Sequence, residues 1–267
     1  MKISIVTISF NQAKFLERAI RSVIEQDYND VEYIIVDPGS TDGSREIIEK
    51  YRDRISKIIF EPDKGPADGL NKGFGKAHGT IYGFLNSDDV LEPGALSSVV
   101  RYFKDNPAVD VVSGHSWIVD SDGEPIRRFY SDRYSLWMAA HGASILSQAS
   151  TFFRAEVFHR AGGFNVENFV AWDGELFADM AIAGARYSRV DKFWSKFRIH
   201  EEGITGSGKL HQAYEGYYHF LFRKIMGREK NIIDRPASVV AKYVRKVANP
   251  QDTMERLFHG PIYKAAK

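Results

Sequence analysis

The 267-residue sequence contains no cysteine. Disulfide bonds, thiolate metal sites and cysteine nucleophiles are therefore excluded. The formal net charge is only +1, so the chain has no overall charge signal for binding nucleic acid or another polyanion. No apolar run approaches the roughly 18 residues that a membrane-spanning helix needs, and the first residues lead into a strand-like run rather than a signal peptide. These absences predict a cytoplasmic protein that does not bind nucleic acid.

Several common catalytic motifs are also missing. The sequence has neither a phosphate-binding P-loop nor a Gly-x-Ser-x-Gly nucleophile turn. The glycines of residues 73–79 do not have the spacing of a dinucleotide-binding fingerprint, and they end a predicted helix instead of following a strand. We therefore expect none of these three sites.

The first half of the chain alternates between buried strands and amphipathic helices. Short β-branched runs predict strands at 3–10, 31–36, 55–60 and 80–85. Apolar residues at helical spacing predict helices at about 15–24, 44–53, 66–77 and from Pro93 to 103, with Asn11 available to cap the first. Strands and helices that alternate at this spacing form a mostly parallel sheet covered on both faces. The sequence therefore predicts an α/β fold.

The second half is less regular. Residues 109–119 and 126–129 have the pattern of a hairpin, residues 150–154 of a strand, and residues 173–184 of a helix. From about residue 210 the chain has a helical and basic pattern to its end. We expect one α/β domain over residues 1–205 and a helical C-terminal extension over residues 206–267.

Polar side chains follow each of the four predicted strands in the first half. Ser9 and Asn11 follow the first strand, Asp37 the second, residues 61–64 the third and residues 86–89 the fourth. In open α/β sheets, ligands bind beyond the carboxyl ends of the strands. We therefore expect these residues to surround one ligand site.

The sequence Asn86-Ser87-Asp88-Asp89 is the most specific of these polar clusters. Two adjacent carboxylates provide the oxygen ligands that Mg²⁺ or Mn²⁺ prefers, especially when the ion is shared with a diphosphate. The alternative is a turn that caps the next helix, since aspartate favours both positions. The other polar strand ends favour the metal site.

Three further residues have both a functional and an ordinary interpretation. Asp37 begins a turn over 37–43 and either accepts a hydrogen bond from a nucleobase or simply stabilises that turn. Asp173 opens a predicted helix, where it is either a general base or a helix cap. His200 ends a strand-like run before Gly203, Gly206 and Gly208, and is either a ligand or a structural side chain.

Taken in order, these motifs resemble those of inverting family 2 glycosyltransferases of the GT-A fold. The resemblance runs from residue 1 to about 205. It rests on the opening strand and turn at 4–11, the Ser-Val-Ile-Glu-Gln-Asp-Tyr segment at 22–28, Asp-Pro-Gly-Ser-Thr-Asp-Gly at 37–43, Asn-Lys-Gly through Ala-His-Gly at 71–79, the DxD region at 84–93, and Gly162-Gly163-Phe164 before Asp173.

The resemblance implies transfer of a sugar from a nucleotide-sugar, most often a UDP-sugar, to a hydroxyl of a glycan or a lipid-linked acceptor. It implies direct displacement at the anomeric carbon with inversion, in which Asp173 takes the proton from the acceptor. Mn²⁺ or Mg²⁺ would be held by Asp88, Asp89 and His200.

The resemblance also implies which residues bind the donor. Asp37 would contact the base, and Ser9 and Asn11 would line the nucleoside pocket. Lys64 and Asp68 would touch the ribose or a phosphate, and Asp88 would contact the donor through the metal.

The chain departs from the family pattern in two places. Asn86 replaces the first acid of the DxD motif, which leaves Asp88 and Asp89 to hold the metal. The Gln-x-x-Arg-Trp motif of processive synthases is absent, which favours transfer of a single sugar. The alternatives are a nucleotidyltransferase, which shares the requirement for nucleotide and metal, and a non-catalytic nucleotide-sugar-binding protein.

The C-terminal extension carries apolar residues at helical spacing in 217–226 and 239–247, with basic residues beside them. Such segments are typical of helices that lie on an anionic membrane surface. The same pattern also fits helices that pack on the core or on a second subunit of a homodimer. The sequence therefore predicts either a peripheral contact with the cytoplasmic face of a membrane, or an extension that packs on the core or on the second subunit of a homodimer.

Overall fold

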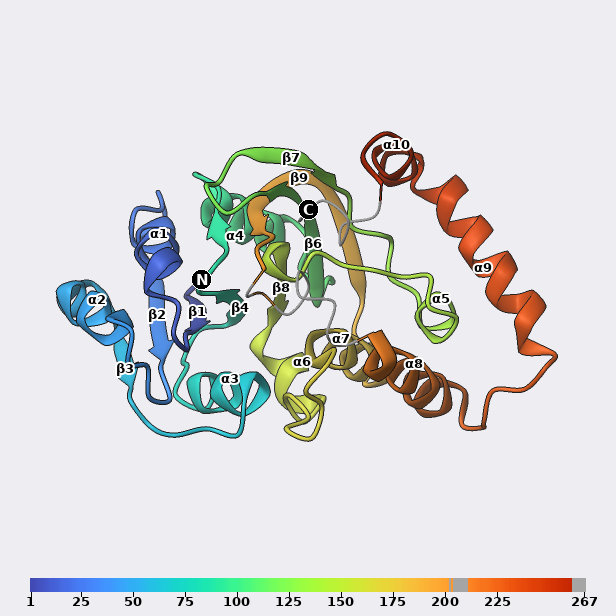
Figure 1. The fold of residues 1–267 in the computed structure, drawn as a ribbon, viewed down its shortest axis with the longest axis horizontal. Helices are drawn as coiled ribbons and strands as arrows, with labels where there is room; N and C mark the ends of the chain where they lie inside the picture. Colours follow the sequence, from blue (N-terminus) through green and yellow to red (C-terminus); the bar gives the residue numbers. More distant parts are fainter. Residues whose placement is uncertain (202, 204–210, 261–267) are drawn as a thin grey trace.

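The computed structural model describes residues 1–201, 203 and 211–260, which form a mixed β-sheet flanked by helices (Figure 1). The strands are β1 (Ile3–Ile8), β2 (Val31–Val36), β3 (Lys57–Ile59), β4 (Ile81–Asn86), β5 (Val90–Leu91), β6 (Val111–Val119), β7 (Pro125–Phe129), β8 (Thr151–Arg154) and β9 (Tyr187–Arg198). The helices are α1 (Ala13–Ile24), α2 (Ser44–Lys50), α3 (Pro66–Phe74), α4 (Ala95–Asp105), α5 (Leu136–Ala140), α6 (Ala155–Arg160), α7 (Trp172–Ile182), α8 (His211–Met226), α9 (Asp234–Ala248) and α10 (Pro250–His259), with short 3-10 turns η1 (Arg52–Arg54) and η2 (Gln148–Ser150).

The sheet confirms the predicted α/β class. Its strand order is β3-β2-β1-β4-β8-β6-β9-β5, with β7 paired to β6 as the predicted hairpin. The pairings make β1, β2, β3, β4, β6 and β9 run in one direction and β5, β7 and β8 in the other. The carboxyl ends of the larger group therefore meet at one edge of the sheet.

Helices cover both faces of the sheet, as the alternation predicts. Successive side chains of a strand point to opposite faces, so Ile5 and Val6 of β1 belong to two different hydrophobic clusters. The cluster around Ile5 includes buried side chains of α1, α2 and α4. The cluster around Val6 includes those of α3, α6 and α7. The central strands are thus buried on both sides, which explains their continuous apolar sequences.

Two helix starts differ from the prediction. Asn11 does not cap α1, because its backbone is left-handed (φ 52°) and its side chain accepts a hydrogen bond from Thr41 N instead. The first turn of α1 is held from the next loop, where Asp42 Oδ2 accepts from Ala13 N at 2.8 Å. Helix α4 begins at Ala95 rather than Pro93, because Gly94 between them has φ 77°.

Two of the sequence motifs hold together segments that are distant in the sequence. Gln26 donates to Glu92 O and accepts from Leu96 N, which holds the segment after the Asn86–Asp89 turn. Asn71 exchanges a pair of hydrogen bonds with the backbone of Phe164, at 2.8 and 2.9 Å. The motifs around residues 71 and 164, far apart in the sequence, therefore clamp each other.

Over the described residues 211–260, the C-terminal extension consists mainly of the helices α8, α9 and α10. Leu221 and Phe222 of α8 are buried, so the apolar stripe in residues 217–226 packs on the protein itself. The stripe of α9 is exposed. The expected boundary at 205/206, Gly206, Gly208 and residues 261–267 lie outside the described residues.

Buried ion pairs join α9 and α10 to the strand and loop that follow β6. Arg245 of α9 contacts Asp132 at 2.6 Å and Asp252 of α10 at 2.8 Å. Asp252 also pairs with the fully buried Arg127 of β7 at 3.4 Å. Asn249 between the two helices donates to Asp132 Oδ1 at 2.8 Å. Because these charged groups are buried, removing one of them leaves its partner without a compensating charge and destabilises the fold.

We expect Arg245→Ala to lower the free energy of unfolding by about 3 kcal/mol, because it leaves two buried carboxylates with fewer partners. Lys242→Ala, at an exposed position of the same helix, serves as the control and should change stability little. Urea denaturation of both variants measures the difference. Equal stabilities would show that the network does not hold the extension.

Candidate active site

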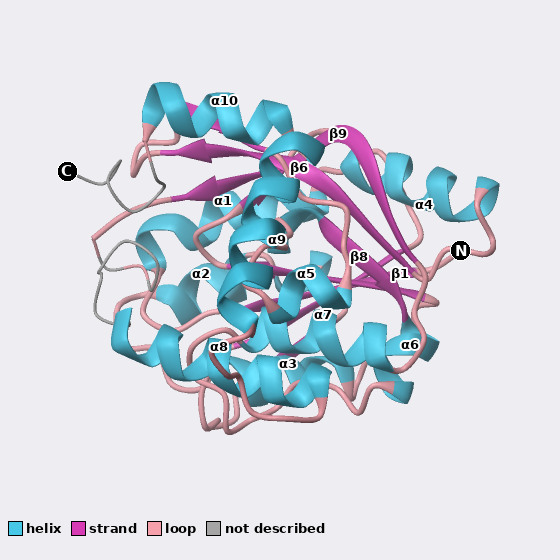
Figure 2. Ribbon diagram, turned by 90° about the vertical axis from the view of Figure 1, so that its right-hand side faces the viewer, coloured by secondary structure: helices cyan, strands magenta, loops and turns pink. Residues whose placement is uncertain are grey.

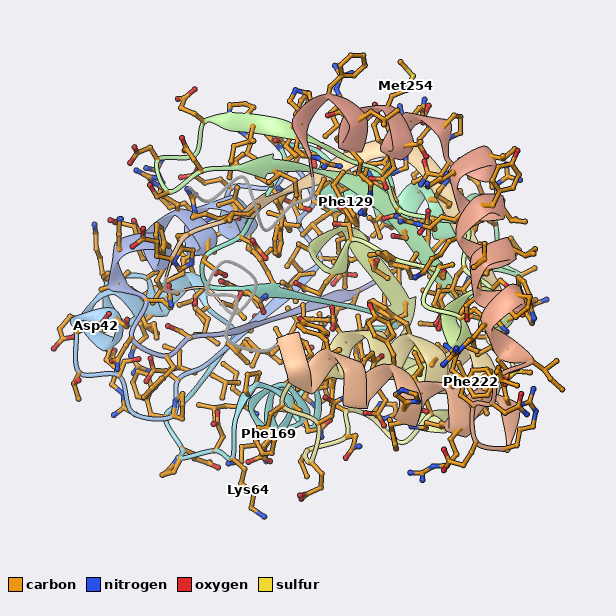
Figure 3. All side chains as sticks on the ribbon, turned by 45° about the vertical axis from the view of Figure 1, so that its right-hand side comes forward. Asp42, Lys64, Phe129, Phe169, Phe222 and Met254 are labelled. Carbon is orange, nitrogen blue, oxygen red and sulfur yellow. The ribbon has the colours of Figure 1, made fainter. Side chains whose placement is uncertain are left out.

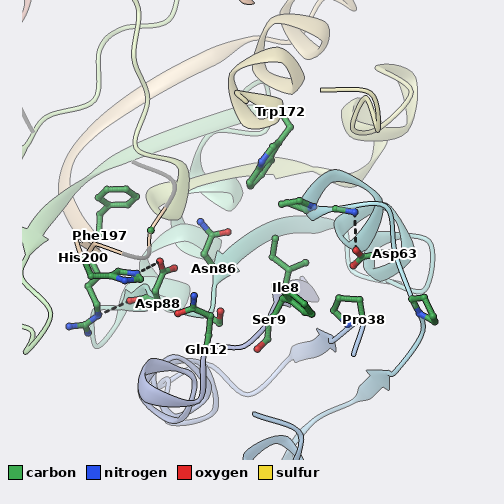
Figure 4. Close-up of a pocket in the computed structure, with 17 residues that line it drawn as sticks. Ile8, Ser9, Gln12, Pro38, Asp63, Asn86, Asp88, Trp172, Phe197 and His200 are labelled. Atoms are coloured by element: carbon green, nitrogen blue, oxygen red, sulfur yellow. Dashed lines mark hydrogen bonds and ion pairs between the residues drawn. The ribbon is translucent and has the colours of Figure 1, made fainter. Parts of the chain in front are cut away.

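A pocket of about 500 Å³ lies at the carboxyl edge of the sheet (Figure 4). Its walls come from the residues that follow β1 to β4, from the start of α7 and from the end of β9. They are Ile8, Ser9, Phe10, Gln12, Pro38, Pro62, Asp63, Gly65, Pro66, Asn86, Ser87, Asp88, Trp172, Phe197, Arg198, His200 and Gly203. The pocket thus lies where the polar strand ends predicted a ligand site.

Asp88 and His200 meet on one wall of this pocket. The His200 Nε2 atom lies 3.0 Å from Asp88 Oδ2, although 112 positions separate the two residues. The imidazole also packs against the ring of Phe15, with 4.6 Å between ring centroids. Both side chains are mostly buried, with 6% of His200 and 22% of Asp88 exposed. The structure therefore brings together two of the three predicted metal ligands.

Asp89 lies behind this wall. Its Oδ1 accepts a hydrogen bond from Arg198 N at 2.9 Å, and its buried Oδ2 has no hydrogen-bond partner among the described residues. Burial, together with the neighbouring Asp88 carboxylate, raises the pKa of Asp89 well above its ordinary value. Asp89 is thus placed to hold the turn, while Asp88 faces the pocket.

Arg198 is a residue of the site that the sequence did not reveal. Its Nε donates to Asp88 O, and its Nη1 donates to Asp120 O and Ser121 O, each at 2.9 Å. The guanidinium therefore ties the Asp88 turn to the loop between β6 and β7. No spacing rule predicts these contacts, because they join segments that are far apart in the sequence.

Asp37 is fully buried beneath the pocket wall, next to the wall residue Pro38. Its Oδ1 accepts from Gly39 N, Ser40 N and Arg45 Nε, at 2.8–3.0 Å. Its Oδ2 has no partner among the described residues, and neither has the buried hydroxyl of Ser9. Buried polar atoms are rarely left unpaired. Ser9 lines the pocket, whereas Asp37 does not.

The structure does not bring Asn11, Lys64 or Asp68 to the pocket wall. Lys64 is exposed and points away from the protein (Figure 3). Asp68 accepts from Lys64 N at 2.9 Å and pairs with Lys72 at 3.3 Å. The side chain that faces the pocket from this loop is Asp63, which accepts from Gly65 N at 2.9 Å.

Asp63 could have been found from the sequence, since it belongs to the polar cluster at 61–64 that follows a predicted strand. Burial raises the pKa of its carboxyl. Asn86, which replaces the first DxD acid, also lines the pocket. Its amide donates to Gln148 Oε1 at 3.3 Å, while its own buried Oδ1 has no partner among the described residues.

Asp173 is not among the residues that line the pocket, but it lies in the first turn of α7, directly after the pocket residue Trp172. It is partly buried, and burial raises the pKa of its carboxyl. The loop before it is held by Glu175, a buried carboxylate that accepts from Asn168 at 2.6 Å and from Lys224 of α8 at 2.7 Å. The extension thus helps to position the start of α7.

The acidic and histidine side chains of the pocket determine which cation it could hold. Within residues 1–201, 203 and 211–260, no group of three or more histidine or acidic side chains converges. Asp88 and His200 together offer an oxygen and a nitrogen ligand. Mg²⁺ and similar ions usually take one or two protein ligands and complete their shell with substrate phosphates and water. The residues present therefore fit an ion shared with a diphosphate.

The fold is shared with solved glycosyltransferases of the GT-A type. A structure of Staphylococcus aureus TarS (residues 1–349) matches 96% of this chain and 73% of its own, with a TM-score of 0.67 and 18% identity. The mannosyltransferase PcManGT from Pyrobaculum calidifontis, solved with GDP-Man and Mn²⁺, matches 96% and 74%, with a TM-score of 0.66 and 18% identity. The chain thus has a GT-A-like fold.

The sequence identifies the family. Residues 4–161 match Glycosyl transferase family 2, and the chain belongs to this family. An uncharacterized glycosyltransferase of Nostoc sp. is 31% identical over 212 residues, which cover 75% of this chain and 65% of the relative. The GalNAc(5)-diNAcBac-PP-undecaprenol beta-1,3-glucosyltransferase of Campylobacter jejuni is 32% identical over 130 residues, 48% of this chain and 42% of the relative. The chain therefore spans between about two fifths and two thirds of these relatives.

Proposed function

We propose that this glycosyltransferase moves a single sugar from a nucleotide-sugar, a UDP-sugar by preference, to a hydroxyl of a glycan or lipid-linked acceptor. The transfer is a direct displacement with inversion, assisted by Mn²⁺ or Mg²⁺. The absence of cysteine suits a reducing compartment, so we place the reaction in the cytoplasm.

The observation that carries this proposal is the contact between Asp88 and His200, 3.0 Å apart on the wall of the pocket that Trp172 also lines. Asp88, His200 and Trp172 line this one cavity, and Asp173 follows Trp172 directly in α7. A cavity of about 500 Å³ is within the usual size of sites for small ligands and cofactors.

The named relatives support the choice of substrates. TarS has been solved with UDP and with UDP-GlcNAc, and PcManGT with GDP-Man and Mn²⁺. The Campylobacter enzyme is named for a lipid-linked acceptor. These names favour a nucleotide-sugar donor with a divalent ion, and an acceptor that is a saccharide or its lipid-linked form.

In the proposed reaction each described residue has a defined task. Asp173 takes the proton from the acceptor hydroxyl as this oxygen attacks the anomeric carbon. Asp88 and His200 hold the cation, which when bound neutralises charge on the departing diphosphate. Arg198 and Asp89 keep Asp88 in place. Asp37 and Ser9 offer their unpaired oxygens to the nucleoside.

The test is to incubate the purified protein with a panel of nucleotide-sugars and Mn²⁺, and to identify the products. We expect slow release of a nucleoside diphosphate together with the free sugar. In a parallel incubation with nucleoside triphosphates and sugar 1-phosphates, release of pyrophosphate together with formation of a nucleotide-sugar would instead indicate a nucleotidyltransferase. Binding of a donor without any turnover, even with saccharide acceptors, would indicate a non-catalytic binding protein.

We expect Asp37→Asn to raise the KM for the donor by about 10–100-fold with little change in kcat, as for the loss of a hydrogen bond to a charged group. The substitution keeps Oδ1, which holds the turn, and replaces the unpaired Oδ2 by an amide. Asp37→Ala provides the comparison, because it also removes the three contacts of Oδ1 and should lower the melting temperature. A fall in kcat at saturating donor in Asp37→Asn would place Asp37 at the reacting centre instead.

A further inference from the structure

Among the described residues, helices α9 and α10 carry an apolar surface that is largely exposed. It comprises Val239, Val240, Tyr243, Val244, Val247, Met254, Leu257 and Phe258, each with between 44% and 78% of its side chain exposed. Ile232 and Ile233, directly before α9, are exposed as well, at 73% and 78%. We call these ten side chains the α9–α10 surface. Water-exposed apolar patches of this extent usually mark an interaction site.

The exposed apolar residues of α9 lie on the side of the helix that faces away from the core. Ala241 is fully buried and Arg245 and Asn249 reach the ion-pair network, so this side of α9 faces the core. Residues of an α-helix advance by about 100° per position, which places Val239, Tyr243 and Val247 on the opposite side. In Figure 2, α9 crosses the front of the molecule, and in Figure 3 Met254 of α10 lies at its outer margin.

The charges beside this surface have one sign. The exposed charged side chains of α9 are Arg235, Lys242 and Lys246, and Lys242 and Lys246 lie along one edge of the apolar stripe. The acids of the two helices are all paired: Asp234 with Arg228, Asp252 with Arg127, Arg245 and Arg256, and Glu255 of α10 with His259. The outer face of α9 is therefore apolar with a cationic edge.

One alternative is a dimer in which the α9 helices of two copies pack together. In such a dimer, α9 of the second copy would provide no exposed acidic partner for Arg235, Lys242 and Lys246. An anionic lipid surface offers both an apolar layer for the valines and aromatic rings and negative headgroups for the bases. We infer that the α9–α10 surface docks the protein on an anionic membrane. The helices lie along the interface, since no described helix is long and apolar enough to cross a bilayer. This inference does not depend on the proposed function.

The test is co-sedimentation of the full chain with vesicles of phosphatidylglycerol and phosphatidylcholine, at low and at high salt. We expect binding that salt weakens, and at least about a tenfold lower affinity for the double variant Lys242→Glu/Lys246→Glu, since each base contributes about a factor of five. Val247→Glu/Leu257→Glu should abolish binding. Vesicles of phosphatidylcholine alone should bind the wild type weakly.

Matched controls use similar residues elsewhere. Ile182, at the end of α7, is an exposed apolar residue, and Lys104 is an exposed base of α4. Ile182→Glu and Lys104→Glu should bind vesicles as the wild type does, and circular dichroism should show all variants folded. The inference is overturned if the wild type does not bind anionic vesicles at low salt, or if all variants bind equally. It is also overturned if light scattering shows a dimer that Val247→Glu/Leu257→Glu converts to a monomer.

Discussion

Asp173→Asn is expected to bind the donor nucleotide normally and to lose sugar transfer by about 10²–10⁴-fold, the usual contribution of a general base. The amide occupies the same volume at the start of α7 but cannot accept the proton of the acceptor hydroxyl. The measurement is kcat with the donor that the panel identifies, together with nucleotide affinity by calorimetry.

The control for this substitution is Asp179→Asn, which makes the same chemical change in the same helix but further from the pocket residue Trp172. It should retain most of the activity. Turnover of Asp173→Asn close to that of the wild type would exclude Asp173 as the base and return it to the role of a helix-start acid that interacts with the helix dipole.

The pH dependence of the wild type provides a second readout of the same group. Burial raises the pKa of Asp173, and only the deprotonated carboxylate accepts a proton. As pH falls, kcat/KM should therefore begin to decrease at a higher pH than the ordinary aspartate value of about 4. Asp173→Asn should lack this acid limb. An identical acid limb in the variant would assign the limb to another group.

Asp88→Ala is expected to abolish the increase in nucleotide affinity that Mn²⁺ produces in the wild type. Transfer should fall by at least about 10²-fold, because neutralisation of the leaving diphosphate is lost. Calorimetric titration of UDP with Mn²⁺ and with EDTA measures the effect. Asp122→Ala, at an exposed position in the nearby loop between β6 and β7, should behave like the wild type.

Asp89 should respond differently from Asp88, although the two residues are adjacent. Its carboxylate binds Arg198 N behind the pocket wall, so Asp89→Ala should reduce stability as well as metal-dependent binding.

Removal of divalent ions tests the role of Asp88 and His200 as metal ligands. If the wild type stays fully active after complete removal of divalent ions, these two residues do not act by holding a metal ion.

The sequence predicts well those strands and helices whose apolar residues form a continuous run or recur at regular spacing. The β-branched runs and the apolar spacing of the first half give the strands and helices found there, because each central strand is buried on both faces. The predicted ends are less accurate: α3 stops at Phe74 and α2 at Lys50, each earlier than expected. Helix ends depend on turns and on contacts with distant segments.

The site was predicted in outline but not in all its members. Ser9, Asp88 and His200, which follow or end predicted strands, line one pocket. Strand-end position fails for Lys64, because only the conformation of the loop decides that Asp63 faces inward and its neighbour outward. Arg198 and Gln148 escape prediction because their partners are remote in the sequence.

The two apolar stripes of the extension show the same limit of prediction from sequence. Residues 217–226 and 239–247 have similar patterns, yet Phe222 of α8 is buried and Val247 of α9 is 65% exposed. A helical period shows that a helix has an apolar face, and it does not show what covers that face. Only the arrangement of α8 against α5 and α7 separates the two.

The most direct test of the proposed reaction is the configuration of the sugar that is released when the enzyme slowly hydrolyses its donor. Proton NMR of the first-formed anomer needs no knowledge of the natural acceptor, since water takes the place of the acceptor hydroxyl. A single displacement at the pocket of Asp88, His200 and Asp173 predicts the anomer opposite to that of the donor, formed only with the divalent ion present. Release of the sugar with retained configuration would contradict the account.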